Sequence, residues 1–169
     1  MVKIIWVKDK YPKNLEIRQV YGIVFDSVGR ILLRIENKPG NKKFYCFGGG
    51  TPESFDKDVE ATLRREMIEE VNTTLKSEVV VVGHQIIEND GNRPPYAQLR
   101  MTALIDNIGE KLPDPDNGEI YDRVLVNPQK AIELLGWGEV GKNQIENAVR
   151  LAEKHFNLKI DPNAPDLPV

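Results

Sequence analysis

Three glutamates are the residues of this sequence best suited to chemistry. Glu66, Glu69 and Glu70 stand at i, i+3 and i+4 in a segment predicted to be helical, so their carboxylates share one helix face. Like charges at this spacing repel one another by about 0.2–0.5 kcal/mol per exposed pair, a repulsion that a divalent cation would reverse. Hard cations such as Mg²⁺ prefer oxygen ligands and usually bring substrate phosphates with them. The spacing indicates a cation site, although a solvated acidic helix face without function is the simpler alternative.

Two neighbouring features favour the cation site over a plain acidic surface. Arg65 stands four residues before Glu69 and can pair with it, which would fix the rotamer of that carboxylate. The glycines Gly48–Gly50 precede the helix, and a backbone without side chains can approach a ligand closely.

The elements around these residues predict a mixed sheet with helices on its faces. The helix should span 58–71, where Val59, Leu63, Met67 and Val71 form one apolar stripe. Two hairpins are expected at 17–34 and 78–105, with further strands at 44–47 and 120–126 and helices at 128–135 and 140–155. The order β-β-β-α-β-β-β-α-α predicts an α/β (α+β) fold.

Composition excludes several classes of protein. The chain has 169 residues, of which 40% are hydrophobic and 29% charged, so it can bury a core and is not disordered. We expect one domain over 1–169, with its core at about 17–156 and a loose tail at 157–169. The formal net charge of −3 gives no general basic surface for nucleic acid. The single cysteine, Cys46, excludes an internal disulfide and a cysteine-rich zinc site.

The segment from the glycines to Val71 resembles the sequence signature of a known enzyme family. Arg65–Val71 reads REMIEEV, after a glycine-rich loop that follows a strand, and this is similar to the core of the Nudix box of Nudix hydrolases. That box reads G-x5-E-x7-R-E-U-x-E-E-x-G-U, where U is a bulky apolar residue. The resemblance covers about 20–135 and implies the Nudix fold, a mixed sheet sandwiched between helices.

The box departs from this pattern in its loop and at its end. Counted without a gap, its first glutamate falls on Lys57 and its first glycine on Thr51. One inserted residue would instead place Gly50 and Asp56 at these two positions. The late glycine of the box is Asn72, the non-glycine residue that best tolerates a left-handed helix cap.

The resemblance implies hydrolysis of a nucleoside diphosphate linked to another group, with Mg²⁺ or Mn²⁺ as cofactor. Carried over to this sequence, the catalytic residues are Glu66, Glu69 and Arg65. The expected metal ligands are Glu66, Glu69, Glu70, Asp56 and a late-loop acid, for which Glu119 stands before Asp114 and Asp116. The expected substrate-binding residues are Gly49, Gly50, Arg34 and Arg100.

Two other functions stay open at this point. A Nudix-fold domain that binds a nucleotide-like ligand without hydrolysis is favoured by the missing first glutamate. An isomerase on the same fold would use Cys46, but no histidine stands near the box in the sequence.

The expected partner is a small nucleoside diphosphate derivative, with no nucleic acid and no membrane. The longest apolar stretch, 79–82, is far shorter than the ~20 residues of a membrane helix, so we expect a cytoplasmic protein. The sequence leaves the substrate, and the choice between a monomer and a homodimer, undetermined.

Overall fold

Two long neighbouring strands form the centre of the sheet. The computed structural model describes residues 1–169. In it, β2 (Glu16–Phe25) runs parallel to β7 (Tyr96–Ile108), in register from Glu16↔Tyr96 to Phe25↔Leu104 with one irregularity. Both strands are largely buried, as parallel strands are when both faces of a sheet are covered.

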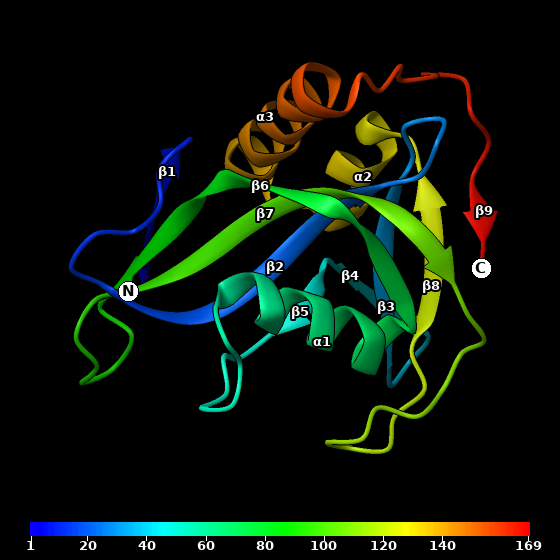
Figure 1. Ribbon diagram of the computed structural model, residues 1–169. Helices are drawn as coiled ribbons and strands as arrows, with labels where there is room; N and C mark the ends of the chain where they lie inside the picture. The colour runs from blue at the N-terminus through cyan, green and yellow to red at the C-terminus, as the bar shows by residue number, and fades with distance from the viewer.

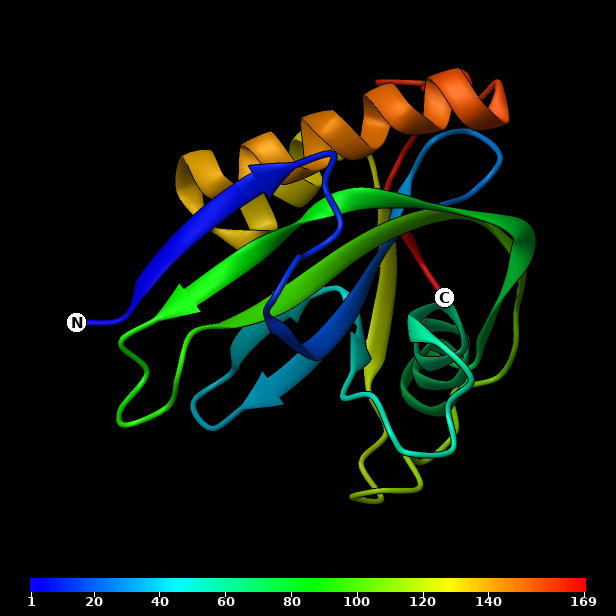
Figure 2. The same cartoon turned by 60° about the vertical axis from the view of Figure 1, so that its left-hand side comes forward.

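The remaining strands extend this pair into a mixed sheet with the order β1-β6-β7-β2-β3-β8-β9, and β4 and β5 branch from β3 and β2. They are β1 (Lys3–Lys8), β3 (Ile31–Lys38), β4 (Lys42–Cys46), β5 (Gly48–Gly50), β6 (Thr73–Glu88), β8 (Asp122–Val126) and β9 (Leu167–Pro168). Helix α1 (Val59–Val71) lies on one face, and α2 (Pro128–Leu135) and α3 (Gly138–Phe156) lie on the other (Figures 1 and 2). This arrangement confirms the predicted fold class.

Of the two predicted hairpins, the second is present over most of its length and the first is much shorter than predicted. Strands β2 and β3 pair only at Phe25↔Ile31. Beyond that point β2 continues along β7 and β5, whereas β3 pairs with β8 and β4. The first hairpin is therefore much shorter than expected. The second, β6–β7, is confirmed, with β6 beginning at Thr73 rather than at Glu78.

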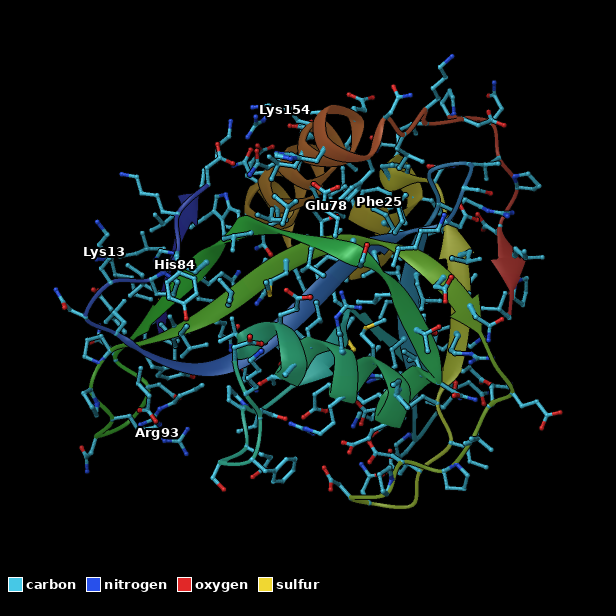
Figure 3. All side chains as sticks on the ribbon, in the orientation of Figure 1. Lys13, Phe25, Glu78, His84, Arg93 and Lys154 are labelled. Atoms are coloured by element: carbon cyan, nitrogen blue, oxygen red, sulfur yellow. The ribbon has the colours of Figure 1, made fainter.

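Each face of the sheet has its own hydrophobic core. On the α1 side, Leu63 and Met67 pack in one buried cluster with Leu99 of β7, as the apolar stripe of the helix predicts. On the other side, Phe25 lies in a cluster with residues of α2 and α3, such as Ile145 (Figure 3). The sheet is covered on both faces, and its edges position the loops that carry polar groups.

Both ends of the chain form strands that the sequence did not predict. β1 pairs antiparallel with β6, for example at Ile5↔Ile86. The segment 157–169 is not the loose tail that we expected, because β9 pairs with β8 at Leu125↔Leu167 and Arg123 Nε donates to the Val169 carbonyl at 3.2 Å. None of the three helices is both long enough and apolar enough to cross a membrane.

Candidate active site

Helix α1 holds the three glutamates in the arrangement that the spacing predicts. It begins after Asp58, whose side chain accepts a hydrogen bond from the Ala61 peptide N–H at 2.8 Å, as an N-cap does. It ends at Asn72, which adopts the left-handed conformation (φ 43°, ψ 50°), as we expected from its place in the box. Both ends are thus fixed, and the glutamates face β5 and the loop that follows it.

The glycines of β5 let the carboxylates approach the sheet closely. A Cβ atom at Gly50 would overlap the Glu66 carboxyl group, and one at Gly49 would overlap the Val20 carbonyl. Gly49 also has a φ of 147°, which side chains rarely adopt. Its peptide N–H donates to Glu70 Oε2 at 3.1 Å. The missing side chain at Gly50 is therefore required for the Glu66 carboxyl group to lie where it does, and the missing side chain at Gly49 lets β5 pair closely with β2.

Arg65 connects the groups of the site through one guanidinium. Its Nη1 donates to Glu66 Oε1 at 3.0 Å and to Glu69 Oε2 at 2.9 Å, and its Nη2 donates to the Thr51 carbonyl at 2.9 Å. The pairing with Glu69 is the one predicted from the sequence. Arg65 is 17% exposed, so these bonds form at a largely dehydrated position and fix both carboxylates.

Asp56 binds the opposite side of the same guanidinium. Its two carboxylate oxygens accept from Arg65 Nε at 3.0 Å and Nη2 at 2.9 Å. The Oδ2 atom also accepts from Thr62 Oγ1 and from the Glu53 peptide N–H, each at 2.9 Å. The bond to Arg65, the largest cause, holds the pKa of Asp56 well below its usual range.

The position of Asp56 differs in one respect from what we expected. The structure agrees with the alignment that inserts one residue in the loop, since Asp56 contacts Arg65 and Lys57 is exposed. Three of the four donors just described bind Oδ2, and only Arg65 Nε binds Oδ1. Asp56 therefore holds Arg65 mainly through a saturated Oδ2, while Oδ1 keeps one acceptor position.

Glu70 lies at the junction of the helix and the sheet. Arg34 of β3 donates through Nη1 to Glu70 Oε1 at 2.6 Å. Burial raises the pKa of Glu70 to about 7, although Arg34 and the Gly49 N–H oppose the rise and the charges of Glu66 and Asp114 add to it. Burial likewise raises the pKa of Glu66. The carboxylates thus carry charge that the protein only partly neutralises.

The loop between β7 and β8 brings further acids to this face. Asp114 is 5% exposed, and its charge adds to the raised pKa of Glu70 that burial produces. Asp116 contributes in the same way, after burial, to the raised pKa of Glu66. Glu119, our first candidate from this loop, is exposed. Asp116 is exposed as well, so of the two acids that we ranked second, Asp114 is the one that is both buried and electrostatically coupled to the helix carboxylates.

A cavity of about 390 Å³ adjoins the carboxylates on the α3 side of the sheet. Arg34 lines it while contacting Glu70, and Arg100 lines it from β7. Arg100, one of the expected substrate-binding residues, is buried in this wall. Three further residues of the wall were not predicted from the sequence: Gln85, Gln98 and Trp137. They carried no signal because they come from separate elements and form no motif.

The remaining candidate nucleophile and bases are not assembled into a site. Cys46 accepts from Arg34 Nε at 3.1 Å, and burial raises the pKa of its thiol, which disfavours the reactive thiolate. His84 Nδ1 lies 2.7 Å from the Lys10 carbonyl, and His155 Nδ1 lies 3.7 Å from Glu78 Oε1. Neither histidine pairs with Cys46, so the isomerase alternative lacks its acid–base partner.

Known proteins provide independent comparisons. The model of the NUDIX domain family matches residues 16–147. Similar solved structures include a NUDIX hydrolase from Nitrosomonas europaea, with a TM-score of 0.60, 15% identity and coverage of 88% of this chain and 100% of that chain.

Two further similar solved structures are those of MutT and of an Ap4A hydrolase. MutT, from a study of Aliivibrio salmonicida and Vibrio cholerae, has a TM-score of 0.56, 19% identity and coverage of 80% and 98%. The Caenorhabditis elegans Ap4A hydrolase has a TM-score of 0.53, 17% identity and coverage of 82% and 100%. At these identities the similarity establishes the fold alone. The chain has no significant match among curated protein sequences.

Proposed function

Because the chain belongs to the NUDIX family, a family of hydrolases acting on diphosphate bonds, we propose that it hydrolyses a nucleoside diphosphate linked to another group, with a divalent cation bound at α1. One observation carries this proposal. Arg65 holds Glu66 and Glu69 of one helix side by side, Glu70 of the same helix lies against Arg34 and the Gly49 N–H, and the missing side chain of Gly50 leaves room for Glu66. A helix without function has no reason to keep such carboxylates together in a partly buried place.

The donor types suit a hard cation, but no three Asp, Glu, His or Cys side chains converge closely enough in this arrangement to hold one, so binding would require the carboxylates to move together. Glu66, Glu69 and Glu70 supply only oxygens, the ligands that Mg²⁺ and Mn²⁺ prefer. Their side chains are 9%, 25% and 11% exposed, so their charges are only weakly screened by water. Burial and the repulsion between neighbouring carboxylates raise the pKa of Glu66 and Glu70. A bound cation would lower the free-energy cost of keeping these buried carboxylates charged. Asp114 or Asp116 would complete the ligand set in place of Glu119.

Individual residues of the chain would position the cation ligands, accept a proton and bind phosphate. A bound cation neutralises phosphate charge and lowers the pKa of water. Arg65 holds Glu66 and Glu69 in place, and one of these two carboxylates takes the proton of the attacking water. Gly50, which has no side chain, lets the Glu66 carboxyl group lie against β5. Arg34, beside Glu70, supplies positive charge where phosphate oxygens would lie.

A phosphate-release assay tests this function directly. The protein would be incubated with nucleotide sugars, dinucleoside polyphosphates and nucleoside triphosphates, with Mg²⁺, with Mn²⁺ and with chelator. We expect release only with metal, and loss of at least about 100-fold in the Glu66→Gln variant, a size typical when a group at the reacting centre is lost. Glu60→Gln, at a half-exposed carboxylate of the same helix that pairs with Arg64, is the matched control and should keep the activity.

Nucleotide binding without hydrolysis is the rival function, and its supporting observation was the missing first glutamate of the box. Asp56 now accounts for that departure, because it makes a bidentate contact with Arg65. If nucleotides bind but none of the panel is cleaved with either metal, the rival function is correct.

A further inference from the structure

Arg100 is buried in the wall of the cavity without a charged partner. It is 3% exposed, and its Nε donates to Gln144 Oε1 at 2.9 Å and its Nη2 to Gln85 Oε1 at 2.8 Å. No carboxylate lies within ion-pair distance of it, and Nη1 has no hydrogen-bond partner at all. Burying a charged group in this way is costly unless something compensates it. Such a site indicates a ligand that supplies the missing acceptor.

The shape and lining of the cavity suit a flat ring. Its volume of about 390 Å³ falls in the range of small-molecule sites. Phe47 and Trp137 form an apolar wall, with their rings at 5.4 Å and nearly perpendicular. The guanidinium of Arg100 stands over the ring of Tyr21, 4.7 Å from its centre. Aromatic surface on one side and polar groups on the other match a nucleobase better than a fully charged ligand.

The unpaired buried polar atom of this wall is a donor. The carbonyl oxygens of Gln85, Gln98 and Gln144 all accept hydrogen bonds from Arg100. The amide nitrogen of Gln98 is also used, because it donates to Gln19. Among the residues that line the cavity, one buried atom remains without a partner, Arg100 Nη1, and it can only donate. A ligand that satisfies it must bring an acceptor.

We propose that this cavity binds the base of the substrate and that Arg100 makes it select a guanine-type base over an adenine-type base. Guanine presents two adjacent acceptors, O6 and N7, whereas adenine replaces O6 by an amino donor that would face the donors of the wall. The inference rests on the proposed function, since Arg34 joins the cavity to Glu70. It goes beyond that function by naming the base and the residue that selects it.

Trp137 supplies a binding signal that does not depend on hydrolysis. Because Trp137 lines the cavity, a bound base should quench its fluorescence. We would titrate the protein with guanosine 5′-monophosphate and with adenosine 5′-monophosphate, in chelator, and use inorganic phosphate as a third arm. We expect the guanine nucleotide to bind at least about fivefold more tightly than the adenine nucleotide, the lower limit for one good base contact. Phosphate alone should cause no quenching.

Variants assign the preference to Arg100. Arg100→Met should reduce the preference to less than about threefold, because a buried charge replaced by an apolar side chain of similar volume no longer donates. Arg150→Met, at an exposed arginine of α3, should keep it. Trp137→Phe should abolish the quenching, since Trp6 does not line the cavity. If Arg100→Met does not fold, Arg100→Lys and the unmodified protein still measure the preference.

The inference is overturned by equal or tighter adenine binding, by no quenching with either nucleotide, by quenching that survives in Trp137→Phe, or by quenching with phosphate alone. Neither monophosphate contains a diphosphate bond, so these outcomes are independent of catalysis. Selective guanine binding without phosphate release would refute the proposed function alone. Phosphate release with unselective binding would refute the inference alone.

Discussion

The contact between Asp56 and Arg65 yields the most specific prediction, which compares Asp56→Asn with Lys57→Gln. The Asp56 carboxylate accepts four hydrogen bonds, two of them from Arg65. Asparagine keeps one acceptor oxygen and turns an amide donor toward one of these groups. Losing one hydrogen bond to a charged group costs about 1.5–3 kcal/mol. We therefore expect the free energy of unfolding to fall by about 2 kcal/mol, which lowers the Tm by about 4–8 °C in a domain of this size.

Lys57→Gln is the matched control, because Lys57 is the adjacent residue and is exposed. A surface change of this kind shifts stability by no more than about 0.5 kcal/mol. We also expect Asp56→Asn to lower phosphate release and Lys57→Gln to leave it unchanged. Loss of the Asp56 contact frees Arg65 and thus misplaces Glu66 and Glu69, and small misplacements at a reacting centre can cost about 100-fold. Thermal unfolding and metal-dependent phosphate release measure the two effects.

The reasoning is refuted if Asp56→Asn unfolds at the same temperature as Lys57→Gln, or if it leaves phosphate release unchanged. Lys57→Glu provides a further comparison, because the first glutamate of the Nudix box falls on Lys57 when the box is aligned without an insertion. It should give little gain. Strong activation by Lys57→Glu, together with a silent Asp56→Asn, would mean that the natural protein lacks a ligand at this position.

Three further predictions concern the carboxylates. Mg²⁺ or Mn²⁺ should raise the Tm by binding the native state, and the double variant Glu69→Gln, Glu70→Gln should lose this rise; an unchanged rise would place the metal elsewhere. Arg65→Ala should abolish phosphate release and also destabilise the fold by about 2–4 kcal/mol, because Arg65 makes several bonds at a largely buried position. Calorimetry that finds a loss below about 0.5 kcal/mol, the value of an isolated surface pair, would contradict this. Finally, burial raises the pKa of Glu70 to about 7, so the metal-free protein should lose stability as the pH rises from about 4.5 to about 7. Urea unfolding should show a smaller loss in Glu70→Gln, and an identical pH profile would argue against the raised pKa.

The sequence predicted the local features of the site well. The i, i+3 and i+4 spacing placed the glutamates on one helix face, and the apolar stripe through Leu63 and Met67 correctly predicted which face is buried. The pairing of Arg65 with Glu69 and the left-handed cap at Asn72 were also confirmed. These features depend on residues within a few positions of one another, which is the range over which helix periodicity and capping act.

The role of Asp56 needed the tertiary structure, although the sequence identified the residue. An insertion could be inferred from the letters of the box, but letters do not show whether a carboxylate meets a cation or a guanidinium. That depends on how the loop after β5 folds back on α1, where Arg65, Thr62 and the Glu53 N–H all donate to Asp56. The same holds for the loop acids, where Asp114 is buried and Glu119 is exposed.

By itself, the sequence determined the fold class, the family resemblance and the glutamates of α1, because each is carried by short-range periodicity or by a contiguous motif. Only the tertiary structure decided the early divergence of β2 from β3, the strand formed by the tail and the donor-lined cavity around Arg100. Arg100 contacts Gln85 of β6 and Gln144 of α3, which stand far from it and from each other along the chain. Contacts of that range depend on how the sheet twists and packs, and no local pattern of residue types records them.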